Sequence, residues 1–289
     1  MDLSFIKNDL ETKGYCMVPN VLSPEEAQLC ASEFKKWQQS ILNHDEFYNH
    51  MIYNGIYKHH QVGHTWHAWF VRTRPRVQEV FKHIWDCDDL IVSFDGSCYI
   101  PKECTKQTRF WTHTDQAPDT KEFNCVQGFV SFTENKERTF VVYEGTHKLH
   151  QTYFQDRNIQ STKNWQVLDP EYVSSIQERK KVLHVKQGTL VLWDSRTFHQ
   201  NQYGAPNTET RMVQYVCFFP KTHIKNTLAM QEKRRKYLET RRTTTHWPAP
   251  IQVIALQPNT YGDNNKLIDY DQVPKTDLSM FEAEIEKII

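Results

Sequence analysis

The fold class of this chain is decided by the stretch Val182-Leu-His-Val-Lys-Gln-Gly-Thr-Leu-Val-Leu-Trp193. Apolar and β-branched residues fill both of its ends, and Lys186-Gln187-Gly188 interrupts them, which predicts a strand, a tight turn and a second strand. Residues 211–219 contain neither glycine nor proline and predict a further strand. Short strands in close succession are typical of a mainly β protein.

Two histidines and one aspartate lie around these strands. His113 and Asp115 precede the decisive stretch, and His199 follows it by six residues. Two histidines and a carboxylate on one face of a metal, with other positions open, is the ligand set of non-haem Fe(II) oxygen chemistry. A double-stranded β-helix, the jelly-roll or cupin-like fold, brings such distant segments together. We therefore expect a jelly-roll core with flanking helices.

The His113-Thr114-Asp115 triplet is weak evidence when taken alone. A chain with 14 histidines contains about one His-x-Asp triplet by composition. A surface histidine beside a solvated aspartate is then the simplest interpretation. The ordered strands, His199 and Arg211 that follow favour the metal site instead.

Arg211 opens the last predicted strand and is the candidate anchor for an anionic co-substrate. A buried guanidinium is costly unless an anion pairs with it, and the distal carboxylate of 2-oxoglutarate offers a planar, bidentate match. Asn201, two residues after His199, is predicted to add a hydrogen bond to the same carboxylate. Asp194 adjoins a turn and is interpreted as a loop carboxylate.

Because side chains alternate between the two faces of a strand, two further residues become candidates for contact with the co-substrate or the substrate. If residues 107–113 are extended, Gln107, Arg109 and Trp111 face the interior together with His113. Residues 125–133 would likewise place Gln127, Phe129 and Ser131 on one face. Arg109 or Gln127 is predicted to contact the second carboxylate of 2-oxoglutarate or the substrate; for Arg109, a salt bridge at the strand end is the alternative.

Four stretches of the chain resemble the phytanoyl-CoA dioxygenase family, in the family's order: Gly14–Glu26, Trp111–Gln116, Phe140–His147, and Gly188–His199 with Arg211. Gly145-Thr146-His147 differs from the commoner Gly-Ser-His of that family by one methyl group. The resemblance implies an Fe(II)- and 2-oxoglutarate-dependent dioxygenase that uses O2 and releases succinate and CO2 while hydroxylating a substrate. Halogenating relatives lack the carboxylate that Asp115 supplies here, so halogenation is disfavoured.

Length and composition favour one domain. The 289 residues are 38% hydrophobic and 13% aromatic, enough for a single core. We expect an N-terminal helical part at about 1–90, a jelly-roll core at about 91–220 and a C-terminal helical extension at about 221–289. Ser23-Pro24-Glu25-Glu26 predicts a capped helix start, and residues 75–85 predict a second amphipathic helix.

Charge and cysteine content restrict the partners and the compartment. The formal net charge is zero, so no electrostatic footprint for nucleic acid or an anionic membrane exists at the level of the whole chain. The seven cysteines include no Cys-x-x-Cys pair. With no apolar leader and no long apolar run, we expect a soluble intracellular, cytoplasmic protein with a small-molecule substrate.

Two segments allow more than one interpretation. Residues 44–70 are rich in tyrosine and histidine; they could form a lid over the iron, an ordinary packed segment, or a second metal site at His60, His64 and His67. Residues 233–242 are basic and could bind nucleic acid or an acidic partner, although the interleaved glutamates favour a solvated helix face. Three classes of function stay open: a hydroxylase of a small molecule or acyl conjugate, an oxygenase of a macromolecule, and a catalytically silent jelly-roll binding protein.

Overall fold

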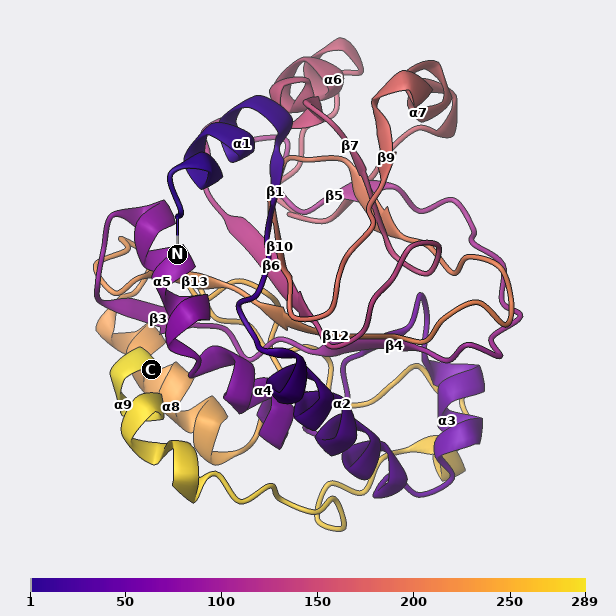
Figure 1. The fold of residues 1–289 in the computed structure, drawn as a ribbon, viewed down its shortest axis with the longest axis vertical. Coiled ribbons are helices and arrows are strands. Elements are labelled where there is room, and N and C mark those ends of the chain that lie inside the picture. The colour runs from indigo at the N-terminus through magenta and orange to yellow at the C-terminus, as the bar shows by residue number, and fades with distance from the viewer. Residues whose placement is uncertain (1) are drawn as a thin grey trace.

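Two antiparallel sheets form the centre of the protein in the computed structural model, which describes residues 2–289 (Figure 1). The larger sheet has the strand order β1 (Tyr15–Val18), β10 (Leu190–Asp194), β6 (Val126–Ser131), β12 (Arg211–Val216), β4 (Ser97–Ile100) and β2 (Ile56–Tyr57). The smaller sheet has the order β8 (Gln166–Val167), β5 (His113–Thr114), β11 (His199–Asn201), β7 (Phe140–Tyr143) and β9 (Lys180–Val182). The fold is the expected jelly roll, but its sheets are not closed into a barrel.

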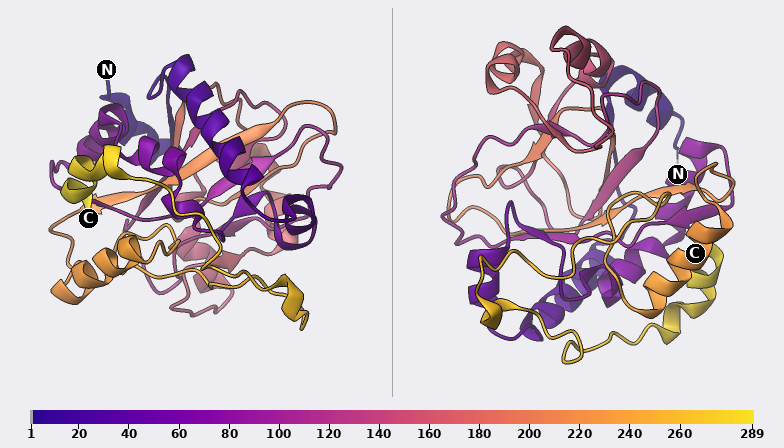
Figure 2. Two further views of the ribbon diagram at one scale, coloured as in Figure 1. Left: turned by 90° about the horizontal axis from the view of Figure 1, so that it is seen from below. Right: turned by 180° about the vertical axis from the view of Figure 1, so that it is seen from behind.

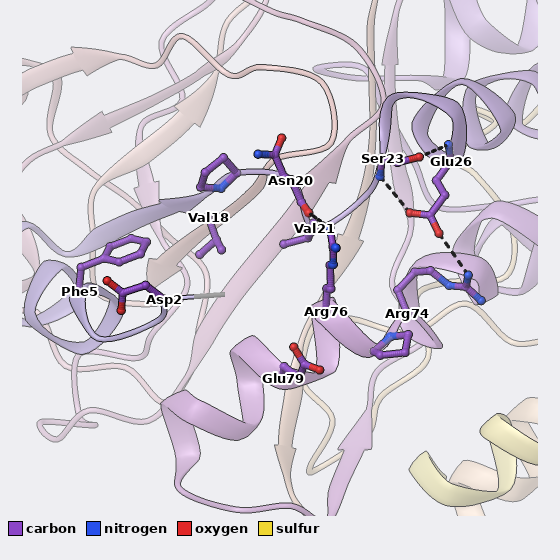
Figure 3. A pocket seen from close by; sticks show the side chains of 12 residues that line it. Asp2, Phe5, Val18, Asn20, Val21, Ser23, Glu26, Arg74, Arg76 and Glu79 are labelled. Atoms are coloured by element: carbon purple, nitrogen blue, oxygen red, sulfur yellow. Dashed lines mark hydrogen bonds and ion pairs between the residues drawn. The ribbon is translucent and has the colours of Figure 1, made fainter.

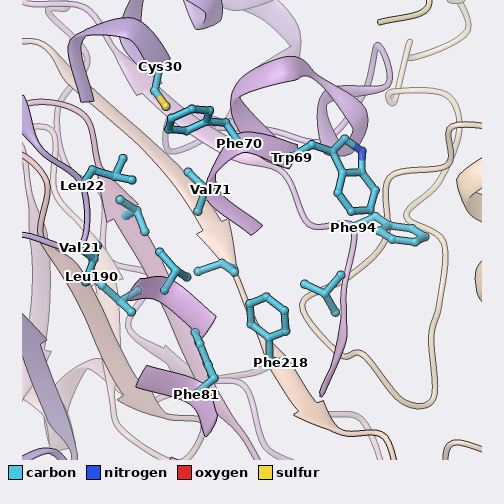
Figure 4. Close-up of a cluster of buried hydrophobic side chains, with 14 of the residues drawn as sticks. Val21, Leu22, Cys30, Trp69, Phe70, Val71, Phe81, Phe94, Leu190 and Phe218 are labelled. Atoms are coloured by element: carbon cyan, nitrogen blue, oxygen red, sulfur yellow. The ribbon is translucent and has the colours of Figure 1, made fainter. Parts of the chain in front are cut away.

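The strand period of two gives the larger sheet two different faces. Phe129 of β6 and Trp193 of β10 point toward the smaller sheet, where both rings pack against Phe140 of β7 at centroid distances of 5.5 and 4.6 Å. Their sequence neighbours, such as Val130 and Leu192, point away and join the main apolar core. Figure 4 shows part of this core, with Leu190 of β10 among the labelled side chains. The space between the sheets is therefore lined by residues at alternate positions.

Helices cover both outer faces of the sheet pair (Figure 1). The face of the larger sheet that points away from the smaller one packs against the N-terminal helices, while α6 and α7 cover the smaller sheet. The helices are α1 (Phe5–Lys13), α2 (Pro24–Gln39), α3 (His44–Met51), α4 (Trp66–Arg72), α5 (Pro75–Trp85), α6 (His150–Asp156), α7 (Pro170–Ser175), α8 (Leu228–Glu239) and α9 (Glu282–Ile288).

The predicted start of α2 is confirmed. The Ser23 hydroxyl accepts a hydrogen bond from the Glu26 backbone N–H, and the Glu26 carboxylate accepts one from the Ser23 backbone N–H, which completes a capping box. Arg74 reaches the same Glu26 carboxylate at 3.4 Å, so α2 is tied to the start of α5 in a surface hollow (Figure 3). The predicted amphipathic helix at 75–85 is confirmed as α5, with four buried apolar side chains, Val77, Val80, Phe81 and Ile84.

The decisive sequence stretch crosses from one sheet to the other. Its tight turn is present, because the Thr189 N–H donates to the Lys186 carbonyl and Gly188 has a φ of +74°. A Cβ on Gly188 would lie 2.3 Å from the Leu22 carbonyl oxygen, so glycine is required there. The flanking strands do not pair with each other, since β9 pairs with β7 and β10 with β6. The predicted strand at 211–219 is likewise divided at Cys217 into β12 and β13 (Phe218–Pro220), which pairs with β3 (Leu90–Val92).

The C-terminal region returns across the body of the protein (Figure 2). Helices α8 and α9 lie side by side, joined by an ion pair of 3.1 Å between Arg235 and Glu286. The final stretch docks on the body through four buried side chains, Leu278, Phe281, Ile285 and Ile288. Arg234 corrects the prediction of a solvated basic helix: it is fully buried and donates to the Asn226 side chain at 3.0 Å and to the Pro248 carbonyl.

Candidate metal and co-substrate site

Three buried side chains of the smaller sheet converge on one point. His113 opens β5 and His199 opens β11; the two residues are direct partners in the antiparallel pair. Asp115 follows β5, and its Oδ2 lies 3.7 Å from Nε2 of His113 and 3.1 Å from Nε2 of His199. One ligand atom from each residue lies within 4.8 Å of the others, which is compact enough to hold a metal ion.

Neighbouring groups orient all three side chains. Nδ1 of His113 lies 3.0 Å from the Trp111 carbonyl oxygen, and Nδ1 of His199 lies 2.8 Å from the Thr197 carbonyl oxygen. These contacts make Nδ1 the protonated nitrogen and leave both Nε2 atoms free to bind a metal. The amide of Gln127 donates to Asp115 Oδ2 at 2.9 Å. Gln127 thus points to the site, as the strand period predicted. It contacts Asp115 rather than an open position; His113, Asp115 and His199 are called the triad below.

The charge states of the triad suit a cation. Burial raises the pKa of Asp115, but the neighbouring His113 and His199 outweigh this effect and hold the pKa well below the ordinary value. Burial, together with His199, lowers the pKa of His113 to about 3. An ionised carboxylate beside a neutral imidazole is the protonation state that metal binding requires.

Arg211 stands on the interior face of β12 as a guanidinium without a partner. The residue is 1% exposed, and neither terminal nitrogen has a hydrogen-bond partner among the described residues. Its guanidinium carbon lies 5.1 Å from the centroid of the Phe129 ring. A buried cation left in this state fits an anion that the protein itself does not supply.

Two more buried polar atoms, on residues that line the same cavity as the triad, lack partners among residues 2–289: Oδ1 of Asn201 and Nε1 of Trp193. Asn201 Nδ2 donates to the Tyr215 hydroxyl at 3.1 Å. The indole of Trp193 lies 5.4 Å from the His199 ring. The residues present therefore fit a small polar co-substrate bound between the triad and β12.

A cavity of about 770 Å³ opens in front of the triad. Its wall includes aromatic side chains from both sheets and from the C-terminal region, namely Trp111, Phe140, Trp165, Trp193, Tyr215 and Trp247. Polar side chains, among them Asp95, Lys58 and His246, interrupt this aromatic wall. A concave, mainly apolar site with a few polar groups is the usual form of a small-molecule pocket.

The prediction for Arg109 requires correction. Residues 104–112 form no regular strand, and both Gln107 and Arg109 are exposed. Side chains hold this segment in place of strand partners: the Thr108 hydroxyl accepts from the Tyr203 N–H at 2.9 Å, and Lys106 reaches the carbonyl groups at the end of α3. The alternation of inward and outward residues therefore does not extend back from His113 to Arg109.

Of the three interpretations of segment 44–70, the structure favours an ordinary packed segment over a lid or a second metal site. Only Ile56 and Lys58 of this segment line the cavity. His64 and His67 are buried; His64 contacts the Arg242 carbonyl at 3.0 Å, and His67 contacts the Thr65 hydroxyl at 3.1 Å. Together with His60 they form no metal-binding group among the described residues. The histidines serve packing and internal hydrogen bonds.

Part of the cavity wall comes from a hairpin that the sequence patterns did not reveal. In residues 243–254, Thr244 pairs with Val253, and the Thr244 N–H donates to the Phe94 carbonyl at 2.9 Å. This C-terminal hairpin brings His246, Trp247 and Ile254 to the cavity. No periodic pattern or motif in the sequence marks these residues. Their position at the cavity depends on the hydrogen bonds between Thr244 and Phe94, which only the structure reveals.

Two further residues, in the stretches that resemble the family, have structural roles. Asp194 was predicted to be a loop carboxylate, but it is the buried last residue of β10; it pairs with Arg196 of the following turn at 2.7 Å. The hydroxyl of Thr146, in the Gly-Thr-His stretch, donates to the Tyr143 carbonyl and accepts from the Phe198 N–H. Thr146 thereby holds β7 beside the chain that leads into His199.

The model of the phytanoyl-CoA dioxygenase (PhyH) family matches residues 10–207 of the chain. The chain belongs to the phytanoyl-CoA dioxygenase family. A relative among curated proteins is Ava biosynthesis cluster protein O of Aspergillus versicolor, 28% identical over 238 residues that cover 74% of this chain and 77% of the relative.

Solved structures of similar fold include two with 2-oxoglutarate bound. HygX from Streptomyces hygroscopicus, with nickel, 2-oxoglutarate and hygromycin B, has a TM-score of 0.51 at 12% identity and covers 74% of this chain and 86% of its own. EctD from S. alaskensis, with 2-oxoglutarate and 5-hydroxyectoine, has a TM-score of 0.52 at 15% identity over 74% of each chain.

This phytanoyl-CoA dioxygenase family member is a non-haem, 2-oxoglutarate-dependent oxygenase, and its cofactors are Fe(II), 2-oxoglutarate and O2. Among residues 2–289, no helix is both long and apolar enough to cross a bilayer.

Proposed function

We propose that this oxygenase hydroxylates a small molecule. In this proposal His113, Asp115 and His199 hold the iron, and Arg211 binds the distal carboxylate of 2-oxoglutarate. Bound together, iron, 2-oxoglutarate and O2 supply an oxidising reaction that releases succinate and CO2 and transfers one oxygen atom to a substrate C–H bond. Asn201 and Trp193 contribute polar atoms beside the co-substrate.

The observation that carries the proposal is the unpartnered guanidinium of Arg211. Its two terminal nitrogens are buried on the interior face of β12, where Arg211 is the direct cross-strand partner of Ile100 of β4. A charge in this environment destabilises the fold unless an anion compensates it. A dicarboxylate that also reaches the triad supplies that anion and explains why the charge is retained.

The protein's own residues prepare the site. The Trp111 and Thr197 carbonyl groups fix the histidine tautomers, and Gln127 holds Asp115 Oδ2 in place. The aromatic wall excludes water from the region where the substrate meets the metal. These contacts exist before any ligand binds, so the site is preorganised.

A small-molecule substrate is favoured by the size of the cavity. About 770 Å³ lies within the range of roughly 300–1,000 Å³ typical of small-molecule sites. A mass-shift screen of +16 with Fe(II), ascorbate and 2-oxoglutarate tests the function. Substrate-stimulated succinate release that depends on His199 supports it; succinate release that persists in His199→Ala contradicts it.

The alternative of a macromolecular substrate has a separate test. Lys233, Arg235 and Lys236 of α8 are available to a polyanion, whereas Arg234 is buried and must be left intact. Replacing the three available residues by alanine should leave turnover unchanged if the substrate is small. Loss of activity in that variant, with a steep dependence of the parent on salt, would favour a nucleic acid.

A further inference from the structure

Asp95 places an additional carboxylate in the wall of the triad's cavity. It lies between β3 and β4 and lines the same hollow as His113 and His199. Its Oδ1 accepts a hydrogen bond of 2.7 Å from the backbone N–H of Gly96. Among residues 2–289, the Asp95 side chain takes part in no ion pair, and its second oxygen has no hydrogen-bond partner.

The backbone around Asp95 is held rigidly. Its carbonyl oxygen accepts from the Arg72 guanidinium at 2.9 Å and from the Gln214 amide at 3.2 Å. Arg72, the nearby buried cation, therefore uses its donors on carbonyl groups rather than on the carboxylate. Phe94, the preceding residue, is fixed by two hydrogen bonds to Thr244 of the C-terminal hairpin. The direction of the carboxylate is thus set by the fold.

This arrangement is unfavourable for the protein without a ligand. Burial raises the pKa of Asp95 to about 7, although the Gly96 hydrogen bond and the charge of Arg72 act in the opposite direction. A carboxylate with a strongly shifted pKa in a cavity is more often found at functional positions than elsewhere. Lys58 lines the same cavity and is exposed, yet it forms no ion pair with Asp95.

The charges of the loaded site leave Asp95 available. The positive charges of Fe(II) and Arg211 are balanced by the negative charges of Asp115 and of the two carboxylates of 2-oxoglutarate. The negative charge of Asp95 therefore has no counterpart within the co-substrate site. Around it, Trp111, Trp165 and Trp247 offer ring faces that favour an aromatic or cationic partner.

We propose that Asp95 anchors the substrate, and that the substrate is a compact molecule with an aromatic or apolar body and a protonated amine or hydroxyl directed at this carboxylate. The inference rests on the proposed function, because it assumes that the cavity receives the substrate. A charge-assisted hydrogen bond makes the amine the stronger partner of the two.

Three probes that share a ring and a two-carbon arm test the anchor: 2-phenylethylamine, 2-phenylethanol and 3-phenylpropionate. Each is titrated anaerobically into the protein loaded with Fe(II) and saturating 2-oxoglutarate. Binding is followed by tryptophan fluorescence and by perturbation of the visible charge-transfer band of the chelated 2-oxo acid. We expect the amine to bind at least about tenfold more tightly than the acid, with the alcohol between them.

Matched variants assign the preference to one side chain. Asp95→Asn keeps the shape and removes the charge, so amine affinity should fall about tenfold while that of the alcohol changes little. Asp88→Asn, an exposed position after α5, should behave like the parent. Thermal unfolding and the 2-oxoglutarate band of each variant establish that it is folded and loaded.

Several results would overturn the anchor. These are equal or tighter binding of the acid, no binding of any probe, or unchanged amine affinity in Asp95→Asn. A gain of more than about tenfold in amine affinity in Lys58→Met would show that Lys58 forms an ion pair with Asp95 in solution. That result would also reject the proposal. Absence of the 2-oxoglutarate band in the parent instead rejects the proposed function.

Discussion

His113 and His199 are direct cross-strand partners, and their imidazole rings lie 4.3 Å apart at the centroids. The pairing of β5 with β11 therefore sets the spacing of two of the three metal-binding candidates. Asp115, two residues beyond His113, completes the group because its backbone N–H donates to the Ser195 carbonyl at 2.9 Å. The register of one short strand pair controls the geometry of the site.

Loss of one imidazole should abolish metal binding. We expect Fe(II) to raise the melting temperature of the parent, since a ligand that binds only the folded state stabilises it. His199→Ala should lose this increase and the charge-transfer band with 2-oxoglutarate, while His184→Ala, at an exposed position, should keep both. A band of normal intensity in His199→Ala would show that the ligand assignment is wrong.

Arg211→Ala should weaken binding of 2-oxoglutarate by about 2–5 kcal/mol while Fe(II) binding is largely retained, because the co-substrate carboxylate loses its buried partner. Arg211→Lys keeps the charge but not the planar pair of donors, so its affinity should lie between those of parent and alanine variant. Isothermal titration under anaerobic conditions measures both. Equal affinity in Arg211→Ala and the parent would place the anchor elsewhere.

Trp193→Phe tests the unpartnered indole N–H. If Nε1 donates to the co-substrate, the variant should bind 2-oxoglutarate about 0.5–1.5 kcal/mol more weakly. The protein without co-substrate should lose little stability, since no hydrogen bond of Nε1 is removed from it. Titration with 2-oxoglutarate and thermal unfolding separate the two effects. Unchanged affinity would mean that the N–H does not face the co-substrate.

Asp95 should make stability depend on pH. Its pKa in the folded protein is raised from 3.8 to about 7, so its favourable contribution is present below about pH 4 and is lost as the pH rises through 7. The Asp95→Asn variant does not lose stability in this way, because asparagine does not ionise. The stability of the variant relative to the parent should therefore increase by about 1–3 kcal/mol between pH 5 and pH 8.5, allowing for partial exposure.

Urea unfolding at the two pH values measures this difference, with Asp88→Asn as the exposed control. A constant difference between Asp95→Asn and the parent would show that the carboxylate is compensated in the folded protein. A partner such as Lys58 would then have to be sought.

The sequence predicted the parts of the site that depend on local patterns. His113 and Asp115 are two residues apart and His199 follows a clear strand, and the structure brings these three side chains together. Arg211 starts the next strand and is buried, and its contact with the co-substrate stays a prediction. Arg109 was placed wrongly because a strand period was extended into residues whose backbone is held by side chains such as Thr108. Periodicity describes a segment only while it has strand partners.

The cavity wall could not be predicted because it depends on contacts between distant segments. The C-terminal hairpin at 243–254 lines the cavity through two hydrogen bonds between Thr244 and Phe94, 150 positions away in the sequence. The burial of Arg234 has the same origin, since its partners Asn226 and Pro248 lie outside the helix. Charge patterns along one helix do not reveal such partners.

The C-terminal hairpin contributes part of the cavity wall from beyond the residues that carry the triad. The triad lies within residues 10–207, which the family model matches, whereas His246, Trp247 and Ile254 lie beyond that match. Exchange of this hairpin would therefore change the shape of the cavity without altering the triad. Grafting residues 243–254 between members of the family is a direct route to redirecting the enzyme.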